Sequence, residues 1–182
     1  MNNSNLLVWM DLEMTGLIPA EDKILEIATV ITDIALNVVE QGPELVIHQA
    51  DKVLGDMNDW CQEHHGKSGL TERVRVSQIN EFEAEERTLE FLKQHINPGE
   101  VPLCGNSIHQ DRNFLAQYMP RLHEFLHYRN IDVSSVKELT YRWYPELPKF
   151  KKSNTHTALQ DILESIEELK YYKEKIFRDT IL

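Results

Sequence analysis

Apolar residues near the start of the chain fall into three runs of strand length. Residues 6–13 are mostly apolar, residues 24–34 are rich in β-branched side chains, and residues 38–48 form a third run that a Gln-Gly-Pro sequence interrupts. Apolar runs of this length, separated by short links, are typical of β-strands. The pattern predicts three strands that form an antiparallel meander.

Helical periodicity replaces this pattern in the rest of the chain. Residues 83–96 and 108–119 each place apolar side chains on one face, and the second of these helices should stop before Pro120. A long helix is expected at residues 157–177. The smaller predicted elements are strands at 101–105 and 131–133, a helix near 135–143 and a loop at 145–154. Because 182 residues suit one domain, we expect a single α/β domain over residues 1–182.

Two acids interrupt the first predicted strand. Asp11 and Glu13 are two residues apart, so their side chains leave the same face of the strand. Two buried carboxylates repel each other and cost several kcal/mol unless something neutralises them. A divalent cation does so, because carboxylate oxygens suit Mg²⁺ and Mn²⁺. The alternative is that both acids lie at an exposed strand end and have no function.

Two further acids lie beside apolar helix faces. Asp111 falls on the stripe that Phe114, Leu115 and Tyr118 share, and Asp161 lies at the edge of the stripe of the last helix. Aspartate is seldom fully buried without a partner. These positions are therefore candidate metal ligands. The alternative for Asp111 is a first-turn acid that the helix dipole favours.

A histidine precedes the last helix. His156 lies five residues before Asp161, and five helical residues turn by about 500°, or about 140° beyond a full turn. The two side chains could not share a face if both were inside the helix. We therefore expect His156 at the start of the helix, with Asn154 or Thr155 as the N-cap. The alternative is a surface histidine without a catalytic role.

The order of these residues is more specific than any one of them. A D-x-E pair in a first strand, an aspartate on a middle helix and H-x4-D at a last helix resemble the histidine-containing branch of the DEDD exonuclease superfamily. The stretches WMDLEMTGL, ILEIATVITD, GNSIHQDRNFL, DVSSVKEL and THTALQDI resemble the oligoribonuclease family in particular, over nearly the whole chain. Gln160 departs from the family, which often has an acid there. That position is not a ligand, so catalysis should not depend on it.

The resemblance implies a fold, a cofactor and a reaction. The fold would be an RNase H-like mixed β-sheet flanked by α-helices. Two divalent metal ions, Mg²⁺ or Mn²⁺, would be held by Asp11, Glu13, Asp111 and Asp161, with Asp11 shared between them. His156 would act as general base in 3′→5′ hydrolysis of short RNA to nucleoside 5′-monophosphates.

The resemblance also implies how substrate is held. Two side chains, Leu17 and Trp60, would flank the bases. Four others would bind the 5′-phosphate, two of them from a second subunit of a homodimer: Ser107 and His65, with Tyr128 and Arg129 of the partner. From the residues alone, core packing for Leu17 and Trp60 and a surface charge for Arg129 would be the default interpretations.

Charge and composition limit the partners. Lys and Arg number 19 against 30 Asp and Glu, a formal net charge of −11. Long nucleic acid is normally bound by many cationic side chains, so an acidic chain fits a short single-stranded RNA better. The sequence has no apolar run of membrane-spanning length, and its first residues do not resemble a secretory signal. With Cys61 and Cys104 as reduced thiols, we expect a cytoplasmic protein without a membrane partner.

Two other functions stay open from the sequence. One is a proofreading-type or repair 3′→5′ DNA exonuclease of the same superfamily, which would share the metal site and accept longer DNA. The other is an inactive oligonucleotide-binding module on this fold. Such a module would tend to lose an acid or the histidine, and all five are present here.

Overall fold

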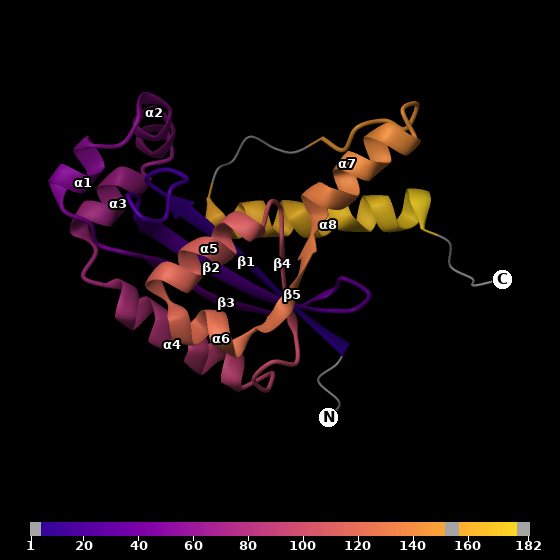
Figure 1. Ribbon diagram of the computed structural model, residues 1–182, viewed down its shortest axis with the longest axis horizontal. Helices are drawn as coiled ribbons and strands as arrows, with labels where there is room; N and C mark the ends of the chain where they lie inside the picture. Colours follow the sequence, from indigo (N-terminus) through magenta and orange to yellow (C-terminus); the bar gives the residue numbers. More distant parts are fainter. Residues whose placement is uncertain (1–4, 152–156, 178–182) are drawn as a thin grey trace.

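A five-stranded mixed sheet forms the centre of the molecule (Figure 1). The computed structural model describes residues 5–151 and 157–177. The strand order is β3-β2-β1-β4-β5. The strands are β1 (Leu6–Met14), β2 (Ile24–Asp33), β3 (Val38–Val46), β4 (Pro102–Gly105) and β5 (His127–Asp132). The first three strands pair antiparallel, which confirms the predicted meander, and β4 and β5 join in parallel.

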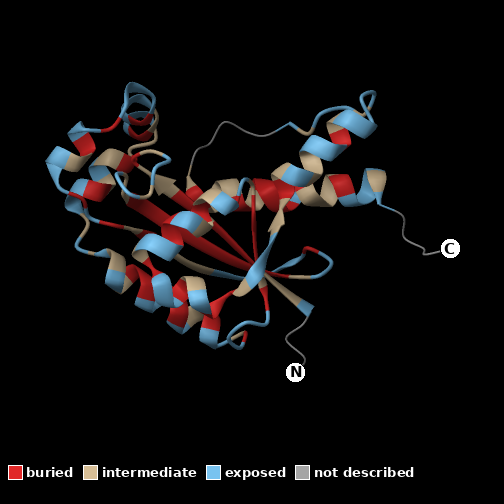
Figure 2. Ribbon diagram, in the orientation of Figure 1, coloured by how far each residue is buried: buried red, intermediate tan, exposed pale blue. Residues whose placement is uncertain are grey.

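The sheet is covered on both faces because side chains alternate along β1. Val8, Met10 and Leu12 point into one apolar core, and Trp9 points into another. The first core is closed by α4 (Glu81–Lys93), α5 (His109–Tyr118) and α6 (Pro120–Phe125), and the second by α7 (Val133–Trp143) and α8 (Ala158–Ile176). Figure 2 shows the buried strands between these two layers of half-exposed helices. The mixed sheet flanked by helices is the fold class that the sequence predicted.

Three short helices lie at one end of the sheet, where the sequence had predicted no element. They are α1 (Asp51–Gly55), α2 (Asp59–Lys67) and α3 (Leu70–Val76). They enclose a small core around Leu25 that includes Leu54, Met57 and Leu70. These helices are short and largely polar. Their apolar residues therefore do not form a stripe long enough to predict a helix from the sequence.

Two predicted boundaries change. The last strand begins at His127, and Val133, which had been assigned to it, starts α7. β5 is an edge strand with exposed, polar residues, so it lacks the apolar run by which strands are recognised. The helix α5 does stop before Pro120, and this proline then begins α6, which had been missed.

The last helix, predicted at residues 157–177, begins one residue later than predicted, at Ala158. The N-cap of α8 is Thr157, whose hydroxyl accepts the Gln160 N–H at 3.4 Å. The expectation of Asn154 or Thr155 as N-cap is therefore wrong. Both of those residues, and His156, lie outside the described residues. None of the helices in the described ranges combines the length and the apolar character that crossing a membrane requires.

Candidate active site

Three carboxylates converge where β1 meets α8. Oxygens of Asp11, Glu13 and Asp161 all lie within 4.8 Å of one another. The odd-numbered residues of β1 face α8, as the burial of Trp9 against Ile162 shows, and Asp161 lies in the first turn of that helix. The predicted strand parity and the predicted helix stripe thus bring together three of the four predicted metal ligands.

The fourth acid, Asp111, lies close by on the other layer. It sits in the first turn of α5 and is only 5% exposed. Its Oδ1 accepts the Leu12 N–H at 2.9 Å. β4 pairs with β1 only at Val8 and Trp9, so the backbone of Leu12 lies beyond that ladder and is free to bind a side chain. Asp111 is therefore tied to the strand that carries Asp11 and Glu13.

Two of these acids, Glu13 and Asp111, have a raised pKa. Burial first, and then the negative charges of Asp161, Glu26 and Asp111, together raise the pKa of Glu13 to about 8 against the opposing effect of Arg73. Burial also raises the pKa of Asp111 to about 7, although the Leu12 N–H counteracts it. A bound positive charge would stabilise the ionised form of these buried carboxylates. The site is therefore suited to a cation.

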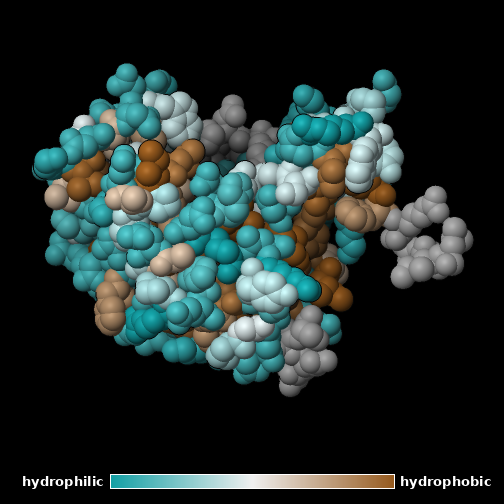
Figure 3. All heavy atoms as spheres, viewed as in Figure 1, coloured by the Kyte–Doolittle hydropathy of each residue, from teal (hydrophilic) through white to brown (hydrophobic). Residues whose placement is uncertain are grey.

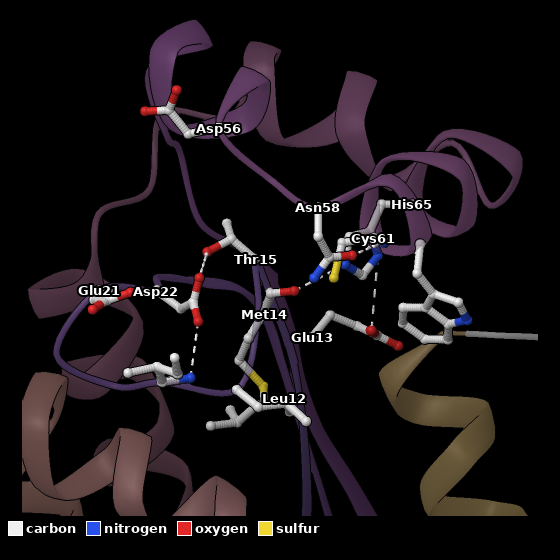
Figure 4. A pocket seen from close by; sticks show the side chains of 14 residues that line it. Leu12, Glu13, Met14, Thr15, Glu21, Asp22, Asp56, Asn58, Cys61 and His65 are labelled. Carbon is white, nitrogen blue, oxygen red and sulfur yellow. Dashed lines mark hydrogen bonds and ion pairs between the residues drawn. The ribbon is translucent and has the colours of Figure 1, made fainter.

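A pocket of about 680 Å³ opens beside Glu13. It is lined on one side by the loop after β1 and on the other by α2, and Figure 4 shows Glu13 between them. Leu17 and Trp60 line this pocket while staying 63% and 66% exposed. Trp60 stacks on His64 with ring centroids 4.4 Å apart. Large apolar side chains that remain exposed at a pocket are available to contact a ligand.

His65 lies at the base of the same pocket. Its Nε2 is 2.9 Å from the Met14 carbonyl oxygen, so this nitrogen carries the proton of the neutral ring. Its Nδ1 is 3.9 Å from the Glu13 carboxylate, and Figure 4 shows the two side chains directed at each other. Burial lowers the pKa of His65. The geometry places His65 against the carboxylate cluster.

Ser107 lies at a different cavity, of about 450 Å³, at the start of α7. Its φ of 50° is unusual for a residue with a side chain. Asp132 and Ser134 stabilise this conformation, because their side-chain oxygens accept the Ser107 N–H at 2.9 and 3.0 Å. The structure thus does not bring Ser107 and His65 to one cavity, although both were assigned to the 5′-phosphate.

Tyr128 and Arg129 lie on the outer strand β5. Tyr128 is 72% exposed, and the Arg129 guanidinium carbon lies 5.3 Å from the centre of its ring. Neither residue lines the two cavities described above. Their position leaves them available to a second molecule. His156, the predicted general base, lies outside the described residues.

Glu26 is a site residue that the sequence reasoning missed. It is fully buried opposite Glu13 on β2 and binds Arg73 of α3 at 2.5 Å. Its other oxygen accepts the Ala158 N–H at 3.3 Å, at the start of the helix that carries Asp161. A signal was present, because Glu26 is the one acid inside the apolar part of the run ILEIATVIT.

Known proteins resemble this chain in sequence and in fold. The RNase T model of exonucleases matches residues 8–169. Oligoribonuclease of Shewanella oneidensis is 58% identical over 97% of this chain and 98% of its own length. Oligoribonuclease of Marinobacter nauticus is 55% identical over 98% and 99%.

Among solved structures, Escherichia coli exonuclease I in complex with single-stranded DNA and zinc superposes with a TM-score of 0.74 at 19% identity. It covers 96% of this chain, which spans 41% of that protein. Exonuclease I of Methylocaldum szegediense gives 0.69 at 18% identity, over 94% of this chain and 41% of its own. These two likenesses concern the fold alone. The family model and the full-length relatives show that the chain belongs to the RNase T exonuclease family, and within it to the oligoribonucleases.

Proposed function

We propose that this chain is a metal-dependent 3′→5′ exoribonuclease that degrades dinucleotide-sized single-stranded RNA to nucleoside 5′-monophosphates. The observation that carries the proposal is the cluster of Asp11, Glu13 and Asp161 beside a pocket with exposed Leu17 and Trp60 at its walls. Membership of the oligoribonucleases supports RNA as the substrate.

The carboxylate cluster fits divalent metal ions. All its donors are oxygens, which Mg²⁺ and Mn²⁺ prefer. Burial raises the pKa of Glu13 and of Asp111, so a bound cation would stabilise their ionised forms. We assign one ion to Asp11, Glu13 and Asp161, and a second to Asp11 with Asp111. When bound, such a pair of ions stabilises charge on the attacking and leaving oxygens of a phosphodiester.

The protein's own residues would supply the proton transfer and hold the substrate. His156, with a pKa normally near 6.5, would accept a proton from the attacking water. The water oxygen bonds to phosphorus as the bond between phosphorus and the 3′ oxygen breaks. The 3′ oxygen takes up a proton from solvent to become the new 3′ hydroxyl, and the terminal nucleotide leaves with a 5′-phosphate. Leu17 and Trp60 would contact the bases, since stacking on an aromatic ring contributes roughly 1–3 kcal/mol per base.

The preference for short RNA would come from binding of the substrate's 5′-phosphate. We assign Ser107 and His65 to the 5′-phosphate of the substrate although they line separate cavities, and Tyr128 and Arg129 of a second subunit would join them. Arginine suits phosphate because its fork donates two parallel hydrogen bonds. The exposure of Tyr128 with Arg129 beside it supports a role across a homodimer interface. The free thiols of Cys61 and Cys104 support a cytoplasmic location.

The test is the identity of the first product. A short RNA labelled at its 5′ end should lose single nucleotides from the 3′ end, and each should be released as a 5′-monophosphate. Asp11→Asn should abolish this release, and His156→Ala should lower the turnover by about 10²–10⁴-fold with little change in substrate binding. Cleavage from the 5′ end, or release of 3′-monophosphates, would contradict the proposal.

A further inference from the structure

The loop at residues 15–23, between β1 and β2, is closed by its own hydrogen bonds. Its two ends are joined where the Thr15 N–H donates to the Lys23 carbonyl at 2.9 Å. The Lys23 N–H in turn donates to the Thr15 hydroxyl at 3.0 Å. This loop carries Leu17, which lines the pocket opposite α2. Its shape therefore decides where Leu17 stands.

The carboxylate of Asp22 lies at the centre of the loop. Its Oδ2 accepts the Ile18 N–H at 2.8 Å, and its Oδ1 accepts the Thr15 hydroxyl at 3.1 Å, as Figure 4 shows. These two bonds flank Leu17 on either side in the sequence. Gly16 leaves room for this carboxylate, because a Cβ at this position would lie 2.4 Å from Asp22 Oδ2 and would displace it.

Tyr118, at the end of α5, fastens the loop to the body of the protein. Its hydroxyl lies 2.7 Å from the carbonyl oxygens of both Pro19 and Asp22, and it accepts the Lys23 ammonium at 3.0 Å. Tyr118 itself packs on the apolar core below the sheet. The Asp22 carboxylate thus binds groups inside the loop, and the Tyr118 hydroxyl connects the loop to α5. Leu17 remains exposed.

We propose that Asp22 and Tyr118 are positioning residues that fix Leu17 at the rim of the pocket before the substrate arrives. The inference rests on the proposed role of Leu17 at the bases and extends it to the residues that hold it. A contact side chain that is already in place loses less conformational freedom on binding. Asp22 and Tyr118 therefore act on affinity for short RNA, and not on the chemical step.

The structural half of the proposal is tested without substrate. In Asp22→Ala, amide hydrogen exchange of residues 15–23 should rise at least tenfold over the unchanged protein. The matched control is Asp33→Ala. Asp33 closes the β2–β3 loop in a similar way, accepting the Asn37 N–H at 2.8 Å and its side-chain amide at 3.0 Å, at the far end of the sheet. Unchanged exchange of residues 15–23 in Asp22→Ala would overturn the proposal.

The functional half is a split between KM and kcat. Asp22→Ala should raise the KM for a short RNA by about tenfold with kcat within threefold, and Asp33→Ala should change neither by more than twofold. In a Leu17→Ala background, Asp22→Ala should cause no further rise in KM, because the two substitutions remove one effect. An equal rise in both backgrounds, or a fall in kcat alone, would overturn the proposal.

Tyr118→Phe keeps the test decisive if Asp22→Ala does not fold, because it removes a single hydroxyl. It should raise exchange in residues 15–23 and the KM for short RNA in the same direction, and unchanged values would overturn the proposal. Failure of the proposed function has a different signature. In that case the unchanged protein itself would not degrade short RNA, whereas the hydrogen exchange of Asp22→Ala would still decide whether the carboxylate holds the loop.

Discussion

At the scale of single residues, the site is a close cluster of acids in which burial and neighbouring negative charges raise the pKa of Glu13. Glu13 lies close to Asp11 and Asp161, and the one arginine that lowers its pKa, Arg73, is bound to Glu26. Natural proteins rarely keep such a cluster unless it binds something. The stability of the metal-free protein should therefore depend on pH.

The pKa values determine whether the free energy of unfolding rises or falls with pH. Those of Glu13 and Asp111 are raised on folding, from 4.5 to about 8 and from 3.8 to about 7. The folded state then binds more protons than the unfolded state between these limits, so the free energy of unfolding falls as pH rises from about 4 to 8. Thermal unfolding in excess chelator should show this fall, and added Mg²⁺ or Mn²⁺ should largely remove it.

Glu13→Gln is the matched variant for this prediction. It removes one charge and keeps the shape of the side chain, so the metal-free protein at pH 8 should become more stable, on the order of 1–3 kcal/mol. Stabilisation by Mg²⁺ should shrink at the same time, and activity should be lost. A metal-free Glu13→Gln protein that is less stable than the parent at pH 8 would show that the carboxylates do not repel each other.

At the scale of elements, helix starts hold the site residues. Asp132 caps α7 by accepting the Ser134 N–H at 3.0 Å, and the same oxygen accepts the Ser107 N–H. Asn80 caps α4 by accepting the Glu83 N–H at 2.9 Å, on a helix that packs against β3 and α6. Both side chains cap a helix in the same way. Of the two, only Asp132 also binds Ser107, a candidate substrate-binding residue.

Alanine at either cap should lower the free energy of unfolding by about 0.5–2 kcal/mol. Only Asp132→Ala should also weaken the binding of a 5′-phosphorylated dinucleotide, because it releases Ser107 from its left-handed conformation. Denaturant unfolding and binding titrations on both variants separate the two effects. Equal binding by Asp132→Ala and Asn80→Ala would remove Ser107 from the 5′-phosphate site.

The elements that the sequence predicts are those with a clear apolar period. β1 and α8 have one, so the alternation in β1 was enough to place Asp11 and Glu13 on one face, and the stripe of α8 placed Asp161 at its edge. That these acids share one site came from the family resemblance. α1 to α3 have no such period. Their apolar side chains pack with Leu25 of β2 and Met57 in a small core at the end of the sheet. The roles of Asp22 and Glu26 depend on contacts with distant residues such as Tyr118 and Ala158, which no local pattern encodes.

At the scale of the whole molecule, an acidic chain acts on an acidic polymer. The net charge of −11 leaves few cations to bind a long backbone, and the site would gain one from a second subunit through Arg129. Figure 3 shows a largely hydrophilic face, with apolar side chains gathered beside β5 and α7. Leu139 and Trp143 of α7 are among the exposed apolar residues there. The homodimer that we propose would use this surface.

Shared sites can be tested by mixing inactive chains. Asp111→Ala lacks a metal ligand and Arg129→Ala lacks the cation. A heterodimer of the two regains one intact site, built from the acids of one chain and the arginine of the other. Mixing Asp111→Ala with Asp11→Ala is the control, since no arrangement of those chains restores a full set of acids. Absence of recovery after verified subunit exchange would show that Arg129 does not act across an interface.

Four carboxylates and the pocket beside them suit a metal-dependent nuclease for very short RNA. The most direct measurement is the initial rate on 5′-phosphorylated RNAs from dinucleotide to decamer, beside DNA of the same sequences, with added Mg²⁺ and with excess chelator. We predict the highest kcat/KM for the dinucleotide, a steep fall with length, weaker activity on DNA and no activity in chelator. Full activity in chelator, or a preference for the longest DNA, would contradict the claim.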